Sequence, residues 1–75
     1  FTRIAKALAD PRRFELLEMI AAEGETACKR MVERFPVSQA TISHHLKELA
    51  TAGLIEARRE GQSGFYRVRP GALDA

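Results

Sequence analysis

Residues 38–55 read SQATISHHLKELATAGLI, and this stretch decides the fold of the chain. Its large apolar side chains recur every three or four residues, the spacing of one helix face. They are Ile42, Leu46 and Leu49. Ser38 is a favourable N-cap, and Gly53 is a favourable residue just past a helix end. The stretch therefore predicts a helix over residues 39–52.

The opposite face of this helix is small and polar, with no acidic and no large aliphatic side chain. The amide of Gln39 can bond an adenine edge through two hydrogen bonds, and the methyl groups of Ala40 and Thr41 can contact a thymine methyl. A solvated helix surface is the alternative, but this combination favours contact with DNA. The candidate DNA-binding residues of the helix are Ser38, Gln39, Ala40, Thr41, Ser43, His44 and Lys47.

The adjacent histidines His44 and His45 raise the question of a metal site, with Cys28 as a third candidate ligand. Consecutive residues point about 100° apart on a helix, whereas side chains three or four residues apart share a face. We therefore expect no metal site and no cofactor. His44 is predicted to face a DNA groove. His45 is predicted to pack at the helix edge, where it bonds a backbone group or a phosphate.

Two helices are predicted in the first 24 residues. The first ends at Asp10, and its apolar stripe consists of Phe1, Ile4, Ala5 and Leu8. The second covers residues 11–22, with Asp10 as its N-cap and Pro11 at its first position, where the missing N–H is harmless. Arg12 and Arg13 at its start are equally compatible with phosphate contact and with pairing to nearby glutamates.

A third helix is predicted over residues 26–35, because Pro36 prevents continuation beyond Phe35. Its apolar stripe consists of Cys28, Met31, Val32 and Phe35. Only Pro36 and Val37 separate it from the N-cap of the next helix. The two helices therefore form a helix-turn-helix candidate.

The pattern changes after Leu54, where IEARRE and FYRVR flank GQSG. Short alternating segments around a glycine-rich turn predict a β-hairpin, with a Gln62–Ser63 tip between two glycines. Tyr66 and Val68 are expected to face the core. The arginines of the hairpin form either a solvated strand face or a wing that contacts DNA, and the position after the helix-turn-helix favours the wing. The candidate wing residues are Arg58, Arg59, Gln62, Ser63 and Arg67.

Bulk properties point to a small binding domain. The chain has 75 residues, a formal net charge of +2 and one cysteine, so residues 1–75 form one domain without an internal disulfide. No acid, base and nucleophile converge in the sequence, so we do not expect an enzyme. No signal peptide or long apolar run is present, which favours a cytoplasmic protein without membrane contact. The chain begins without Met, so we expect it to be part of something longer.

Three segments together resemble the ArsR/SmtB family of winged helix-turn-helix repressors. They are LADPRRFELLEMI, VSQATISHHLKELATAGLI and ARREGQSGFYRV, and they span nearly the whole chain. The resemblance implies a mainly α fold of four helices followed by a two-stranded wing. It implies a homodimer that binds a palindromic operator in double-stranded DNA and leaves it when an effector binds. It also implies a fifth helix, truncated here after RPGALDA, that forms the dimer interface with the first. The interface residues would then be Phe1, Ile4 and Leu8.

The chain departs from the metal-sensing members that this family includes. In arsenic and cadmium sensors the third helix carries a C-V-C element, whose cysteines would fall at Ala27 and Lys29. Cys28 lies between these positions, on the apolar stripe, so we expect a small buried hydrophobic residue there. An alternative function is a winged-helix module that binds protein. It is disfavoured because the exposed helix face carries Gln, Ser and His in place of aromatic residues or Leu.

Overall fold

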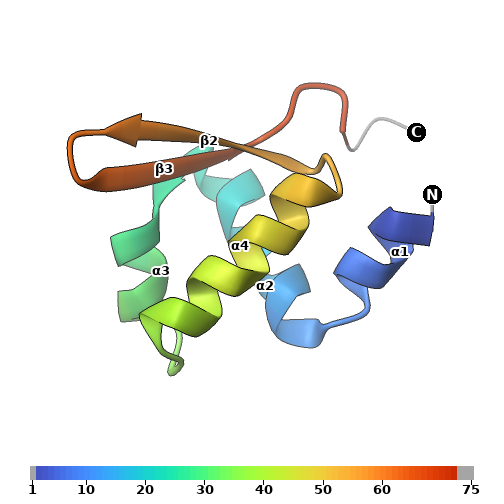
Figure 1. Ribbon diagram of the computed structural model, residues 1–75, viewed down its shortest axis with the longest axis horizontal. Coiled ribbons are helices and arrows are strands. Elements are labelled where there is room, and N and C mark those ends of the chain that lie inside the picture. The colour runs from blue at the N-terminus through green and yellow to red at the C-terminus, as the bar shows by residue number, and fades with distance from the viewer. Residues whose placement is uncertain (1, 73–75) are drawn as a thin grey trace.

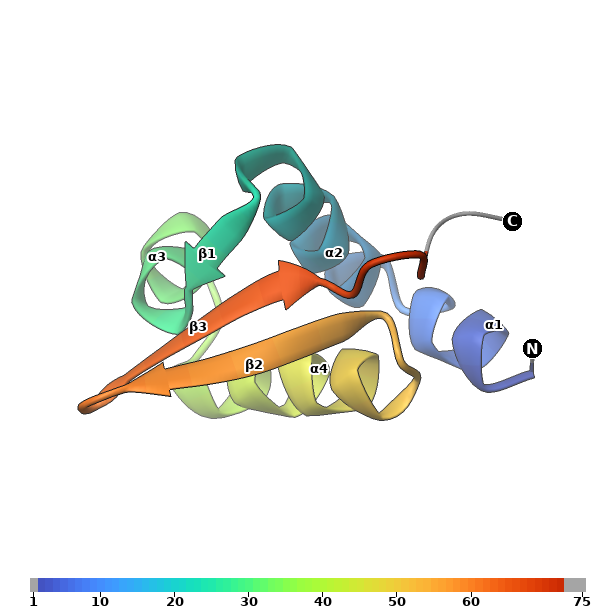
Figure 2. The ribbon, with the colours of Figure 1, turned by 90° about the horizontal axis from the view of Figure 1, so that it is seen from above.

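The computed structural model describes residues 2–72, with side chains from Ile4 onward. In chain order its elements are α1 (Thr2–Leu8), α2 (Pro11–Glu23), β1 (Glu25–Ala27), α3 (Cys28–Arg34), α4 (Gln39–Thr51), β2 (Ile55–Glu60) and β3 (Ser63–Val68). The sheet lies across one side of the helices, and the β2–β3 hairpin runs over α4 (Figures 1 and 2). The predicted winged helix-turn-helix architecture is confirmed.

The ends of α2 and α4 follow from the capping residues in the sequence. The carboxylate of Asp10 accepts hydrogen bonds from the backbone N–H groups of Arg12 and Arg13, at 2.9 and 3.2 Å. Gly24 ends α2 with a φ of 86°, a conformation that glycine adopts without strain. At the start of α4, Ser38 Oγ accepts from the backbone N–H of Thr41 at 3.2 Å. Both predicted helices are confirmed to within one residue.

The sheet has one strand more than the sequence predicted. Residues 25–27 form β1, which pairs antiparallel with β3 in the strand order β1-β3-β2. The third helix was predicted to begin at residue 26, and that start is wrong because α3 begins at Cys28. Thr26 lies opposite Tyr66, a partner 40 positions away in the chain. Such a pairing has no signal in a local window, because the strand is short and its partner is distant.

The hairpin turn also differs from its predicted form. Glu60 pairs with Ser63, so the two-residue turn consists of Gly61 and Gln62, not Gln62 and Ser63. Gly61 has a φ of 61°, as a tight hairpin turn with glycine at its first position requires. Gly64 lies within β3 and is not among the glycines with positive φ. Only the first of the two glycines is therefore required by the turn.

One core joins the helices to the sheet. Its fully buried apolar side chains are Leu16, Ile20, Met31, Ile42, Leu46, Leu49 and Leu54. Tyr66 and Val68 pack against this core, as the strand alternation predicted. On α1, Leu8 packs on the core while Ile4 is 37% exposed.

The chain after β3 turns back towards the core. The backbone N–H of Ala72 donates to the carbonyl of Arg69 at 2.9 Å, and Ala72 packs against the core. A fifth helix beginning in this segment would continue into residues 73–75, which lie outside the described part. Phe1, a predicted dimer residue, also lies outside it. None of the described helices is long and apolar enough to cross a membrane.

Candidate nucleic-acid interface

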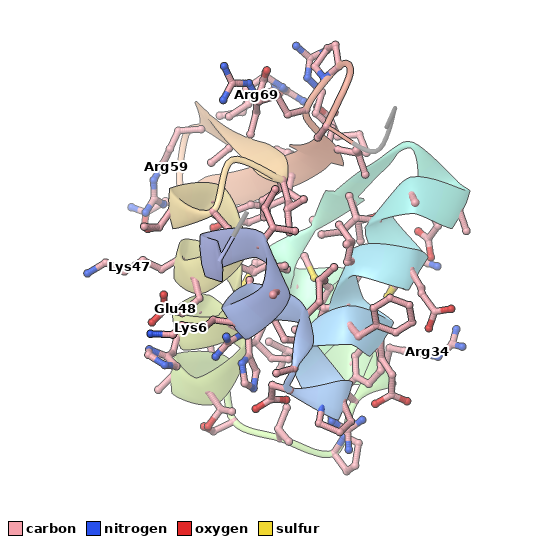
Figure 3. All side chains as sticks on the ribbon, turned by 90° about the vertical axis from the view of Figure 1, so that its right-hand side faces the viewer. Lys6, Arg34, Lys47, Glu48, Arg59 and Arg69 are labelled. Carbon is pink, nitrogen blue, oxygen red and sulfur yellow. The ribbon has the colours of Figure 1, made fainter. Side chains whose placement is uncertain are left out.

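The outward face of α4 is exposed along its whole length. Ile42, Leu46 and Leu49 are buried at the inner side, as predicted. The residues predicted to contact DNA are all exposed: Ser38, Gln39, Ala40, Thr41, Ser43, His44 and Lys47. At 100° per residue, Ala40, His44 and Lys47 lie near the centre of the outward face, and Gln39 and Ser43 lie at its edge towards the wing. Lys47 projects away from the body of the molecule (Figure 3).

The two adjacent histidines have different environments. His44 is exposed, and its Nε2 lies 3.9 Å from the carboxylate of Glu48. Glu48 therefore lies beside His44 on the outward side of α4, and the prediction that this face has no acidic side chain is wrong. His45 is 7% exposed and faces α2, where its Nδ1 accepts a hydrogen bond from Arg13 Nε at 3.4 Å. His45 therefore packs against the protein, as predicted, and His44 is exposed, while its contact with a DNA groove stays a prediction. The predicted partner of His45, a backbone group or a phosphate, is wrong, because α2 places a guanidinium there.

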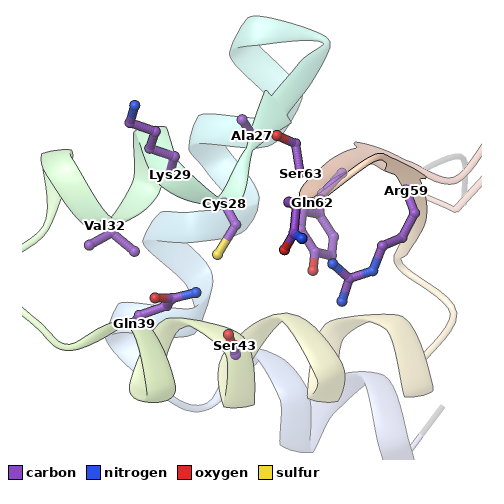
Figure 4. Close-up of a pocket in the computed structure, with 11 residues that line it drawn as sticks. Ala27, Cys28, Lys29, Val32, Gln39, Ser43, Arg59, Gln62 and Ser63 are labelled. Carbon is purple, nitrogen blue, oxygen red and sulfur yellow. The ribbon is translucent and has the colours of Figure 1, made fainter.

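A cavity of about 420 Å³ separates α4 from the wing. We call it the wing groove. It is bounded by Lys29 and Val32 of α3, Gln39 and Ser43 of α4, and Arg59 and Gln62 of the hairpin. Figure 4 shows Arg59 extending from the strand towards α4 and Ser43. The groove therefore joins the edge of the outward helix face to two cationic side chains from different elements.

The wing arginines divide between the two faces of the sheet. Arg59 shares its face with Ile55 and Ala57 of β2 and points towards α4, whereas Arg58 and Arg67 point the other way. We call these the inner and outer faces. The sequence did not separate the three arginines, because which face meets α4 depends on how the hairpin packs.

Carboxylates neutralise the arginines of the outer face. Arg58 forms ion pairs with Glu25 at 2.8 Å and Glu60 at 2.6 Å, and Arg67 pairs with Glu56 at 3.1 Å. The hydrogen bond to Glu25, followed by the bond to Glu60, raises the pKa of Arg58 above its usual value. The same bond with Arg58 lowers the pKa of Glu25.

The cations beside α4 have no such partners. Within the described residues, no ion pair or side-chain hydrogen bond forms at Lys29, Lys47 or Arg59. Figure 3 shows Lys47 and Arg59 on one side of the molecule and Arg34 on the other. Sequence reasoning missed Lys29 of α3, because the groove that it lines with Arg59 forms only when the hairpin packs beside α3 and α4. The only local signal was that Lys29 lies next to the apolar stripe residue Cys28, which indicates an exposed position but no partner.

Cys28 lies at the wall of the wing groove and is only partly buried. The prediction of a small buried hydrophobic residue is therefore correct only in part. Cys28 packs against the core with Val32 and Phe35, but its sulfur points into the groove (Figure 4). The described residues contain no group of three His, Cys, Asp or Glu side chains that could hold a metal ion.

The two arginines at the start of α2 both have partners within the protein. Arg12 lies 3.4 Å from Glu15, and its guanidinium stacks over the ring of Phe35 at 5.1 Å from the centroid. Arg13 bonds His45 and the carbonyl of Ala7. The sequence left open whether these arginines bind phosphate or pair with glutamates. Arg12 pairs with a glutamate, whereas Arg13 does neither and instead connects α2 to α4 and α1.

Comparisons with known proteins agree with this geometry. A family model described as a helix-turn-helix domain matches residues 8–58. The arsenical resistance operon repressor of Staphylococcus xylosus is 37% identical over 71 residues, which cover 95% of this chain and 67% of that protein. An uncharacterised HTH-type transcriptional regulator of Methanocaldococcus jannaschii is 38% identical over 65 residues, which cover 87% of this chain and 73% of that protein.

Solved structures show the same fold. A homodimeric winged helix-turn-helix DNA-binding domain from Mycobacterium bovis, a possible ArsR-family regulator, superposes with a TM-score of 0.81 at 39% identity, covering 89% of this chain and 61% of that one. HlyU from Vibrio cholerae superposes with a TM-score of 0.83 at 32% identity, covering 91% and 73%.

The fold and the exposed polar face of α4 define a winged helix-turn-helix domain of the kind found in transcriptional regulators. The chain belongs to the ArsR/SmtB family of these regulators. The prediction made from the three sequence segments is confirmed. The family and the fold are those of DNA-binding regulators and not of enzymes.

Proposed function

We propose that the chain binds double-stranded DNA with α4 in the major groove and the wing against the adjacent backbone. The observation that supports this most directly is the outward face of α4, which exposes mainly small and polar side chains. The groove at its edge is also lined by Lys29 and Arg59, which form no ion pair with any residue that the structure describes. A buried strip on the opposite side fixes the helix in place. The helix has 13 residues, which corresponds to about 20 Å, and B-DNA admits a helix in its major groove.

The residues of α4 divide by role. Gln39, Ser43 and His44 carry groups that can bond base edges, and Ala40 can contact a thymine methyl. Ser38 and Thr41 lie at the start of the helix, where Ser38 Oγ donates to Thr41 Oγ1 at 3.0 Å. They are better suited to a phosphate beside the helix start than to bases in the groove.

Phosphate contact from the wing is proposed for Arg59, with Lys29 across the groove and Lys47 on α4. Gln62 and Ser63 at the hairpin tip line the same groove. Arg58 and Arg67 were predicted to share this role, but each would have to give up an ion pair before it could bind phosphate. We assign them to the structure of the wing.

The chain is proposed to act as one domain, residues 1–75, of a homodimeric repressor in the cytoplasm. Two-fold symmetry would present two copies of α4 to the half-sites of a palindromic operator. Ile4 is exposed on α1 and is available for the dimer contact, whereas Leu8 already packs on the core. An effector-dependent release from the operator is proposed from the family, and no catalytic role is proposed.

Selection from randomised duplex DNA tests this function. The retained fraction should contain a common half-site, and Gln39→Ala, Ser43→Ala and His44→Ala should each weaken binding to it by roughly 1 to 3 kcal/mol. Arg34→Ala is the matched control, because Arg34 projects from the other side of the molecule (Figure 3). Equal losses on selected and random duplexes would show that these side chains do not read sequence.

A further inference from the structure

Arg13 joins three helices through one side chain. It belongs to α2, its Nε donates to His45 Nδ1 on α4 at 3.4 Å, and its Nη1 donates to the carbonyl of Ala7 near the end of α1 at 3.4 Å. Its backbone N–H also bonds the capping carboxylate of Asp10. His45 lies on the inner side of α4, next in sequence to the outward-facing His44.

The hydrogen bond between Arg13 and His45 depends on the protonation state of the imidazole. Nδ1 accepts a bond only when the ring is neutral and its proton is on Nε2. A protonated ring carries N–H groups on both nitrogens, so Nδ1 and the guanidinium would face each other as two donors and two positive charges. Gain of a proton by His45 therefore removes the bond and repels Arg13.

Charged groups from two helices surround His45. Arg12 and Arg13 of α2 and His44 of α4 disfavour its charged form, while Asp10 at the start of α2 favours it. Burial of the ring is the largest influence, and together these effects lower the pKa of His45. The folded protein therefore holds His45 neutral at pH values where the unfolded chain already begins to bind a proton.

We propose that Arg13 is a positioning residue, which holds α4 in register with α1 while His45 is neutral and releases it when His45 is protonated. The inference rests on the proposed function of α4 as the helix that reads DNA. It makes DNA binding depend on the protonation state of His45, because one guanidinium couples the end of α1 to the outward face of α4. Acid would then weaken sequence-specific binding from the inner side of the helix.

The sign of the pH effect follows from the lowered pKa. A group whose pKa is lower in the folded state than in the unfolded state stabilises the fold above the unfolded value, about 6.5 for histidine. The stabilisation is lost as the pH falls through that value towards the folded pKa. Operator binding should weaken as the pH falls through the lowered pKa of folded His45, because the register of α4 changes with the proton on His45.

The first experiment uses nuclear magnetic resonance without DNA. The imidazole signals of His45 and the amide signals of residues 7–9 are followed against pH in the 75-residue chain. We expect both to titrate with one midpoint, because Arg13 bonds both sites. In Arg13→Ala the midpoint of His45 should rise, and the response of residues 7–9 should disappear.

Asp10→Asn is the matched control variant. Asparagine is as good an N-cap as aspartate, so α2 should be retained while the negative charge is removed. The midpoint of His45 should then fall, opposite to its shift in Arg13→Ala, and residues 7–9 should still follow it. The proposal would be overturned if the amide signals of residues 7–9 did not shift as His45 titrates in the wild-type chain.

The second experiment measures affinity for the selected duplex above and below the midpoint of His45. Both the wild-type chain and His45→Gln retain His44, so the ratio of their affinities isolates His45. This ratio should fall by about fivefold or more on acidification, the lower end of typical coupling between sites. A constant ratio would overturn the proposal that protonation of His45 weakens DNA binding. If no variant binds any duplex, the proposed function fails, while the titration without DNA still decides whether Arg13 couples the helices.

Discussion

The inner and outer faces of the wing sheet carry arginines with different surroundings. On the inner face, Arg59 lines the wing groove and has no ion-pair partner among the described residues. On the outer face, Arg58 and Arg67 are held by carboxylates of β1 and β2. Arg58 also stacks over the ring of Phe65, at 4.7 Å from its centroid.

The difference teaches that a basic hairpin does not offer all its charge to a polyanion. A cation that is already paired gains less from a phosphate, because the existing partner must first be displaced or repelled. Arg58 and Arg59 are adjacent in sequence, and their alternation in the strand sends one to each face. The following experiments use this contrast, from the largest expected effect to the smallest.

The largest effect is expected in the salt dependence of DNA binding. Each lysine or arginine that neutralises a phosphate contributes about 0.9 to the slope of log K against log salt. Arg59→Ala and Lys29→Ala should each reduce the slope by about that amount per subunit. Arg58→Ala and Arg67→Ala are the matched controls and should leave it nearly unchanged. A reduction by Arg58→Ala equal to that by Arg59→Ala would remove the distinction between the faces.

The next largest effect is expected from replacing a buried hydroxyl on the inner side of the sheet. Thr26 is fully buried opposite Tyr66, and its Oγ1 has no hydrogen-bond partner in the described structure. Thr26→Val replaces the hydroxyl with a methyl group of similar shape, so we expect it to stabilise the fold by about 1 kcal/mol. Denaturant unfolding measures this difference. A destabilised variant would show that Oγ1 is hydrated or bonded in solution.

The hairpin turn gives a more local contrast of similar size. Gly61→Ala forces a side chain into a positive φ and should destabilise the fold by about 1 kcal/mol. Gly64→Ala should be tolerated better, because a Cβ there would meet the Tyr66 side chain no closer than 3.4 Å. Thermal unfolding of the two variants compares them. Equal destabilisation would place the turn one residue later, as the sequence had predicted.

The smallest effect concerns the carboxylate of Glu25. Because the bond with Arg58 lowers the pKa of Glu25, the ion pair stabilises the wing at neutral pH and loses this effect as the pH falls through that pKa. Arg58→Ala should therefore raise the pKa of Glu25, whereas Arg67→Ala should raise it less. Carboxyl chemical shifts measured against pH test the order of the two changes.

Much of the fold could be predicted because its signals are local. Asp10, Pro11 and Gly24 define α2, and Ser38 and Gly53 delimit α4, through caps that act within a few residues. β1 could not be predicted in this way. Residues 25–27 become a strand only because β3 provides its hydrogen-bond partners, and no window around Thr26 contains them.

The residues of the candidate site likewise divide into those with a local signal in the sequence and those that depend on distant contacts. The outward residues of α4 were predicted because the period of a helix assigns each residue to a face. Lys29 was missed, Arg58 and Arg67 were grouped with Arg59, and the partner of His45 was misassigned. Each of these three points concerns a contact between elements, such as the one that brings Arg13 to His45 across 32 residues.

The sequence by itself determined the helix-turn-helix, the polar face that it exposes and the family to which the chain belongs. These follow from caps, periodicity and a specific run of residues, all of which act over short distances along the chain. Only the tertiary structure decided which wing arginine faces α4, which carboxylates neutralise the others and which side chain holds His45. The physical reason is that ion pairs, burial and hydrogen bonds between elements depend on distances in space, and these are set by how the helices pack against the sheet.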